Sequence, residues 1–137
     1  MIVADTGAIL ALLDSDERHH QTLREHFEAA PGEWLLPWAI LPEVDYLAST
    51  QLGAPVAQAF LADLTDGVFA VEWSSSVDLA RARELHRRYR TLQLGLTDAV
   101  VIAVAERLKA DAIATLDLRH FSAVAIRGNP KLLPRDL

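Results

Sequence analysis

Residues 2–8 read Ile-Val-Ala-Asp-Thr-Gly-Ala, and this stretch decides how the rest of the chain is interpreted. A short apolar run rich in branched residues ends in the carboxylate of Asp5, and a segment with helical apolar spacing begins at Ile9. The pattern predicts a buried strand that turns directly into a helix, with Asp5 at the carboxyl end of the strand. Ligands bind at this edge of open parallel sheets, but an aspartate there is also a common N-cap. Asp5 alone therefore does not indicate catalysis.

The composition fits a single globular domain covering residues 1–137. Hydrophobic residues make up 51% of the chain and charged residues 23%, which excludes a disordered protein. The absence of cysteine excludes thiol chemistry and fits a reducing cytosol, so we expect a cytoplasmic protein. The longest apolar run, residues 99–105, is far shorter than the roughly 20 residues of a membrane span, and no targeting segment is visible. We therefore expect no association with a membrane.

The net charge of −6 comes from 13 basic and 19 acidic residues. Proteins that bind nucleic acids usually carry a basic surface, so the sign argues against that class. A metal site lined by carboxylates would itself add negative charge, which makes the distribution of charge more informative than the sum. Five of the basic residues lie within residues 81–90, where Arg83, Arg87 and Arg90 share a face by helical spacing. This face is the best candidate for contact with phosphate groups, and the alternative is the ordinary solvated side of a helix that buries Leu79.

Glu43 lies near the predicted start of a helix. It follows Pro42, which suits a first helical turn, and it shares an apolar stripe with Ile40 and Val44. A glutamate inside such a stripe is unusual because isolated buried charge is costly. A place at the edge of the stripe is an equally good explanation, so both stay open.

Two further acids lie at predicted element boundaries, and the second of them, Asp117, repeats the opening arrangement. Asp98 lies at the start of the most apolar helix of the chain, residues 96–105, with Thr97 as its expected N-cap. The helix dipole favours a carboxylate in the first turn, so Asp98 also has a structural alternative. Asp117 follows a buried strand predicted at residues 112–115.

Strands alternate with helices along the chain. The strands are expected at residues 2–4, 33–37, 68–71, 112–115 and 123–126. This order predicts an α/β fold of the three-layer α/β/α sandwich type, with a central, mainly parallel sheet covered on both faces. In such folds the carboxyl ends of the strands and the starts of the helices share one edge, so the four acids are expected to converge there.

Four carboxylates in one place repel one another. Either several of them hold a proton, or a divalent cation makes their ionised forms compatible. Oxygen ligands without histidine or cysteine suit Mg²⁺ or Mn²⁺ rather than zinc. The matching chemistry is hydrolysis of a phosphodiester, in which the metal activates a water and stabilises charge on the phosphate oxygens.

Taken in order, the acidic stretches resemble the motifs of the PIN-domain ribonucleases. Residues 2–8 resemble the first motif, and residues 42–47 (Pro-Glu-Val-Asp-Tyr-Leu) are similar to the second. Residues 96–99 (Leu-Thr-Asp-Ala) resemble the third motif, and residues 113–121 (Ile-Ala-Thr-Leu-Asp-Leu-Arg-His-Phe) resemble the fourth. The order, the spacing and the total length fit over essentially the whole chain. Within this superfamily the chain is most similar to the compact VapC toxins of toxin–antitoxin pairs.

The resemblance implies a Mg²⁺-dependent endoribonuclease, with Mn²⁺ as a substitute, that cuts RNA. It also implies a homodimer that is inhibited by a small cognate VapB-like antitoxin. By position, the catalytic and metal-binding set would be Asp5, Glu43, Asp98 and Asp117. Asp5 and Asp98 would be direct ligands and Glu43 a ligand through water, whereas Asp117 occupies a position that varies in the family.

The resemblance also covers residues beside the acids. Thr6 and Thr115 resemble the hydroxyl residues that accompany the first and fourth acids. Gly7 departs from the serine or alanine of many relatives. Trp38 and Tyr46 flank Glu43, where they are expected either to anchor an antitoxin or to belong to the core.

Three other interpretations remain open. A PIN nuclease with a housekeeping role in RNA processing would share every motif. A non-catalytic PIN-like binding module would be expected to lack one or more of the acids, and all four stand here. The Asp-Thr-Gly of residues 5–7 also resembles the active-site loop of the aspartic proteases, which are all-β proteins.

Overall fold

A computed structural model describes the whole chain, residues 1–137. Five short strands form one sheet in the order β3-β2-β1-β4-β5, and every neighbouring pair is parallel. The strands are β1 (Ile2–Ala4), β2 (Trp34–Pro37), β3 (Ala70–Glu72), β4 (Ala112–Ala114) and β5 (Lys131–Leu133). Val3 pairs with Leu35 on one side and with Ile113 on the other. Because β1 is covered along both edges and on both faces, its residues are all apolar and buried.

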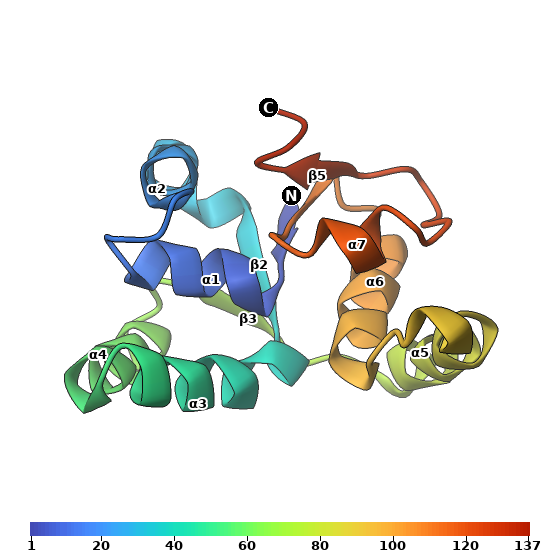
Figure 1. Cartoon of the computed structure of the whole chain (residues 1–137), viewed down its shortest axis with the longest axis horizontal. Coiled ribbons are helices and arrows are strands. Elements are labelled where there is room, and N and C mark those ends of the chain that lie inside the picture. Colours follow the sequence, from blue (N-terminus) through green and yellow to red (C-terminus); the bar gives the residue numbers. More distant parts are fainter.

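Seven α-helices surround the sheet. They are α1 (Thr6–Leu13), α2 (His20–Ala29), α3 (Leu41–Gln51), α4 (Ala54–Thr65), α5 (Ser76–Arg88), α6 (Leu96–Leu108) and α7 (Leu118–Phe121). In Figure 1, α1 to α4 gather to the left of β1 and β2, and α5 and α6 lie to the right. The predicted three-layer α/β/α sandwich is confirmed, and the sheet is parallel throughout. None of the helices combines the length and the apolar character that a membrane crossing requires.

The central helix of the molecule is α6, as its composition predicts. Its residues 99–105 are all buried, and the helix packs against β1 and β2. Gly95 is the N-cap of this helix, so the expectation that Thr97 caps it is wrong. Asp98 nevertheless lies in the first turn, as expected.

The last strand lies further along the chain than the pattern indicates. Residues 123–126 form no strand; Val124 and Ile126 are buried there by side-chain packing alone. The strand is β5, whose Leu132 and Leu133 are buried and pair with β4. A short apolar run beside a turn has the same composition whether it forms a strand or an irregular buried segment. The sequence pattern therefore could not distinguish residues 123–126 from the true strand.

Two helix details also differ from the sequence expectation. Ser15 and Asp16 are residue types that favour a helix N-cap, so the sequence predicts a helix start there. The second helix begins instead at His20, because the Asp16 backbone N–H donates to the Asp14 carboxylate in a turn (3.0 Å). In α5, Leu79 is 59% exposed rather than buried.

The exposure of Leu79 follows from its neighbour. The Asp78 carboxylate accepts a hydrogen bond from the Ser75 backbone N–H (3.0 Å) and pairs with Arg107 (2.8 Å). These bonds turn Asp78 inward, and Leu79, the next residue on the helix, points outward.

Candidate active site

Asp5 lies at the carboxyl end of β1, in the middle of the sheet. Its backbone N–H donates to Ala114 O of β4 (2.8 Å), and its carbonyl accepts the Ile9 N–H of α1 (3.3 Å). The side chain makes no capping hydrogen bond to α1, and Asp5 is only 5% exposed. A role for this carboxylate as a helix cap therefore does not explain its burial.

Thr115 connects the first and the fourth acid. Its buried hydroxyl donates to Asp5 Oδ2 (2.9 Å) and accepts the Asp117 backbone N–H (3.0 Å). Because Thr115 follows β4 directly, the carboxyl end of one strand orients the acid at the end of the next. Thr6 is also buried, but its hydroxyl has no hydrogen-bond partner in the protein. Buried hydroxyls without a partner are rare and costly, so a polar ligand near Asp5 would fit this position.

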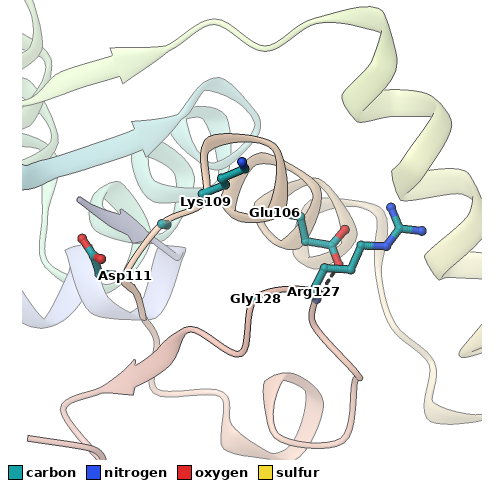
Figure 2. A pocket seen from close by; sticks show the side chains of 6 residues that line it. Glu106, Lys109, Asp111, Arg127 and Gly128 are labelled. Atoms are coloured by element: carbon teal, nitrogen blue, oxygen red, sulfur yellow. Dashed lines mark hydrogen bonds between the residues drawn. The ribbon is translucent and has the colours of Figure 1, made fainter.

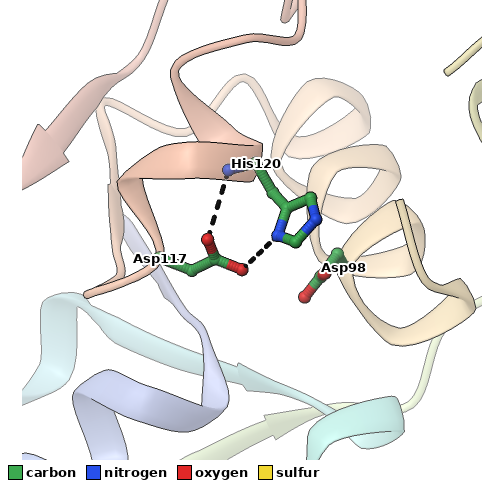
Figure 3. A group of neighbouring side chains, drawn as sticks. All are labelled: Asp98, Asp117 and His120. Atoms are coloured by element: carbon green, nitrogen blue, oxygen red, sulfur yellow. Dashed lines mark hydrogen bonds and ion pairs between the residues drawn. The ribbon is translucent and has the colours of Figure 1, made fainter. Parts of the chain in front are cut away.

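Asp98, Asp117 and His120 form a compact cluster, drawn in Figure 3. One ligand atom from each lies within 4.8 Å of those of the other two. Asp98 comes from the first turn of α6, and the other two residues come from the start of α7. In Figure 3 the Asp98 carboxylate points toward Asp117 and His120.

Both ring nitrogens of His120 are occupied. Nδ1 lies 2.6 Å from Asp117 Oδ2, and Nε2 lies 3.1 Å from Leu92 O. Two oxygen acceptors are best satisfied by the imidazolium form, and the hydrogen bond with Asp117 raises the pKa of His120. A histidine with both nitrogens used in this way has none left for a metal. The two carboxylates are therefore the better ligands in this cluster.

Glu43 lies in the first turn of α3 and is exposed, whereas Ile40 and Val44 beside it are fully buried. It therefore stands at the edge of the apolar stripe and not within it. Its negative charge still contributes to raising the pKa of Asp5 and of Asp98, so it faces the same region. The starts of α1, α3 and α6 point toward this region at the centre of Figure 1.

The electrostatics of the site favour a cation. Burial, followed by the charge of Asp98, raises the pKa of Asp5 to about 7. Burial, followed by the charge of Asp117, also raises the pKa of Asp98. Asp5 is therefore partly protonated at neutral pH unless a positive charge takes the place of its proton. A divalent cation held by oxygen donors would supply that charge.

Only two of the three arginines predicted to contact RNA lie on the same helix. Arg83 and Arg87 are exposed on α5 and make no salt bridge. Arg90 lies beyond the end of α5, in a 3₁₀ turn at Arg90–Leu92. The helical spacing that grouped the three residues therefore does not apply to Arg90, although all three are exposed.

A second polar hollow lies near the other end of α6, and Figure 2 shows its lining. The Glu106 carboxylate there accepts the Arg127 backbone N–H (2.9 Å) and pairs with Arg81 (2.8 Å). Glu106 lies eight residues beyond Asp98, about 12 Å along the helix at a rise of roughly 1.5 Å per residue. This hollow is separate from the acidic cluster, and its carboxylate is already engaged within the protein.

The sequence prediction names the four acids with Thr6 and Thr115 but assigns no role to His120. The signal was present, because His120 follows Asp117 by three residues, the spacing at which helical side chains meet. Its second contact, with Leu92 O, joins residues that are far apart in the chain and has no sequence signal.

The sequence-family model of the PIN domain matches residues 2–127 of this chain. The chain belongs to the PIN-domain family. Its sequence is 28% identical over 123 residues to Ribonuclease VapC26 of Mycobacterium tuberculosis. The aligned region covers 90% of this chain and 91% of that protein.

Solved structures support the same assignment of fold. VapC20 of Mycobacterium tuberculosis, described as a toxin that cleaves the sarcin-ricin loop, has a TM-score of 0.81 at 23% identity, covering 93% of this chain and 98% of its own. The DNA-bound VapBC of Salmonella typhimurium has a TM-score of 0.72 at 16% identity, covering 96% of this chain and 95% of its own. The parallel sheet excludes the aspartic-protease interpretation, because that family is all-β.

Proposed function

We propose that this protein is a metal-dependent endoribonuclease of the VapC type, the toxin of a VapBC toxin–antitoxin pair. Ribonuclease VapC26 is similar to it over nearly the full length of both proteins. The observation that carries the reaction class is the convergence of acids at the carboxyl edge of the sheet, with Asp98 and Asp117 within reach of one ion. This arrangement suits the hydrolysis of phosphodiesters in RNA.

Mg²⁺ is the proposed cofactor, and Mn²⁺ is expected to replace it. Oxygen donors without free nitrogen or sulfur ligands suit both ions. Asp5 and Asp98 are the proposed direct ligands, with Asp117 beside Asp98 and Glu43 acting through a water. When bound there, the ion would lower the pKa of a water and stabilise negative charge on the phosphate.

The protein's own residues hold this set in place. Thr115 fixes the Asp5 carboxylate from the neighbouring strand. His120 keeps a proton on Nδ1 against Asp117 Oδ2 and so restrains that carboxylate beside Asp98. Groups that are oriented before the substrate arrives need no reorganisation during the reaction, which is how such sites lower barriers.

Partners beyond the metal are also proposed. RNA is the substrate, with Arg83, Arg87 and Arg90 as candidate phosphate contacts. A VapB-like antitoxin and a second copy of the chain are the proposed protein partners. Leu79 and Leu96, both more than half exposed, line an apolar groove between α5 and α6, the kind of surface that protein partners cover.

The proposal is tested by incubating the purified chain with a mixed RNA pool in Mg²⁺, in Mn²⁺ and in EDTA. We expect cutting that requires metal and that falls at least about 100-fold in Asp98→Asn, since this carboxylate acts in the reaction itself. Circular dichroism and thermal melting check that the variant is folded.

Asp66→Asn is the matched control. It makes the same chemical change at an exposed residue that ends α4, away from the acidic cluster, and it should cut like the parent. Equal cutting by the parent and Asp98→Asn would contradict the proposal. Cutting that persists in EDTA would contradict the metal requirement.

The toxin role has its own test. Production of the chain in a bacterial host is expected to arrest growth in a manner that requires Asp98 and is relieved by a small partner protein encoded beside it. A housekeeping nuclease would be tolerated by the host without such a partner.

A further inference from the structure

Two of the three tryptophans form an exposed stack on the surface. The rings of Trp38 and Trp73 lie 4.7 Å apart between centroids, at an interplanar angle of 31°. Trp38 is 46% exposed and Trp73 is 66% exposed, whereas Trp34 is 1% exposed. Large aromatic surface left in water is unfavourable unless something covers it, so this pair requires an explanation.

The stack lies at the same edge of the sheet as the acids. Trp38 follows the last residue of β2, and Trp73 follows the last residue of β3. The sheet order places β2 next to β1, which ends at Asp5, and β3 one strand further out. Neighbouring strands are about 4.8 Å apart, so the stack begins on the order of 5 to 10 Å along the edge from Asp5.

The backbone around Trp73 is anchored on both sides. The Glu72 carboxylate pairs with Arg107 (2.8 Å) and accepts the Ser74 backbone N–H (3.2 Å). Ser74 has a φ of 69°, in the left-handed region that disfavours residues other than glycine. Strained residues of this kind persist where the surrounding structure holds them, and they cluster at functional sites. Trp73 is therefore held at the surface and is not a loose loop residue.

The charge of the protein favours a nucleobase as the occupant. The chain has a net charge of −6, and the carboxylates of the site repel phosphates, so contacts with the RNA backbone contribute less here than in basic proteins. Stacking of bases on aromatic rings does not depend on charge and tolerates any base. It would supply affinity in the place where the electrostatic contribution is weakest.

The size of the surface also favours a base over a protein. A stable protein interface buries roughly 800 Å² on each partner, whereas one aromatic side chain buries roughly 150–250 Å². Two partly exposed indoles fall well short of such an interface, but they match the flat face of one base.

We propose that the Trp38–Trp73 stack binds the base of a nucleotide that flanks the cleaved phosphodiester. The inference rests on the proposed function, because it places the stack in the path of the RNA across the acidic edge. The stack is a positioning site: it holds the substrate strand and takes no part in the proton or phosphate chemistry.

The test measures RNA binding separately from cutting. In the Asp98→Asn background, tryptophan fluorescence is titrated with an oligoadenylate and with a ribose-phosphate strand of the same length that lacks bases. We expect quenching by the oligoadenylate alone, with the buried Trp34 providing a constant background. Trp73→Ala and Trp38→Ala should weaken oligoadenylate binding about 5- to 100-fold, and Trp73→Phe, which retains a ring, should weaken it less.

Val68→Ala is the matched control, because Val68 is 46% exposed like Trp38 but precedes β3. It therefore lies near the amino ends of the strands, whereas the acids lie at the carboxyl ends. If Trp38→Ala and Trp73→Ala both bind oligoadenylate as tightly as the parent while the parent cuts RNA with metal, this inference is overturned and the proposed function stands. Loss of binding to a partner protein with no loss of RNA binding would assign the stack to that partner and also overturn it. A parent chain that neither binds nor cuts RNA would instead overturn the proposed function.

Discussion

At the scale of single residues, Asp5 is the most constrained group in the site. It is 5% exposed, and its pKa is raised from 3.8 to about 7, first by burial and then by the charge of Asp98. A buried carboxylate of this kind destabilises the protein when it ionises, and a bound cation would remove the penalty. Stability and metal binding are therefore linked through the same proton.

The effect of Asp5 ionisation on the stability of the protein can be measured. Because the folded protein holds the Asp5 proton more tightly than the unfolded chain does, the metal-free protein loses stability as pH rises from about 4 to about 7. The full cost is on the order of 4 kcal/mol, at 1.36 kcal/mol for each pH unit between 3.8 and about 7. Asp5→Asn should therefore be more stable than the parent at pH 8 in EDTA and nearly equal to it at pH 4.

Urea unfolding at the two pH values checks this expectation, with Mg²⁺ added in a second series. The ion should stabilise the parent at pH 8 and leave Asp5→Asn nearly unchanged. If Asp5→Asn is less stable than the parent at pH 8 in EDTA, the ionised Asp5 carboxylate does not destabilise the metal-free protein.

At the scale of elements, a cluster of ion pairs joins β3, α5 and α6. Arg107 of α6 pairs with Asp78 of α5 (2.8 Å) and with Glu72 of β3 (2.8 Å). Asp78 is only 2% exposed, so it depends on this partner. The same cluster anchors the backbone that carries Trp73. It thus connects the packing of the α5–α6 layer to the edge of the sheet that carries the acids.

Arg107→Gln is expected to destabilise the protein by about 2 to 3 kcal/mol, because it leaves the buried Asp78 carboxylate without its charged partner. The value is below that of a fully buried pair since the Arg107 side chain is 31% exposed. Urea unfolding at pH 7 measures the change, and Arg83→Gln, which removes an unpaired arginine from α5, should alter stability by less than about 0.5 kcal/mol. Equal effects of the two substitutions would mean that the cluster does not stabilise the fold.

At the scale of the whole molecule, the net charge of −6 must be reconciled with an RNA substrate. The exposed arginines of α5 are local exceptions in an acidic surface. Arg83 and Arg87 make no salt bridge, so their charge is available to a ligand. The proposed division of labour is that a few phosphate contacts and the aromatic stack supply affinity while the acids hold the ion.

This division predicts a weak dependence of RNA binding on salt. In the Asp98→Asn background, replacing Arg83 and Arg87 together by glutamine should reduce the slope of log affinity against log salt by about 1.4, or roughly 0.7 for each phosphate that the protein no longer neutralises. The matched control replaces Lys109 and Arg127, which line the hollow of Figure 2, by glutamine and should leave the slope unchanged. A slope that is the same for both double variants would exclude the two α5 arginines as phosphate contacts.

Much of the fold could be predicted from local patterns alone. The alternation of apolar strands and amphipathic helices predicted the parallel sheet between two helical layers, and the run at residues 99–105 predicted the buried helix α6. The placement of an acid just after a strand or in a first helical turn predicted their common edge. These features depend on residues close together in the chain, so spacing and composition are sufficient to determine them.

Other features depended on contacts between distant segments. The pairing of β5 with β4 decided which apolar run became the last strand, and the ion pair of Asp78 with Arg107 turned Leu79 outward. The link from Thr115 to Asp5 and the stack of Trp38 on Trp73 each join residues that only the sheet order brings together. The sequence by itself determined which edge of the sheet would carry the acids, because the residue after a strand always lies there. The tertiary structure alone decided which side chains meet at that edge, because strand order is set by long-range pairing that local spacing does not encode.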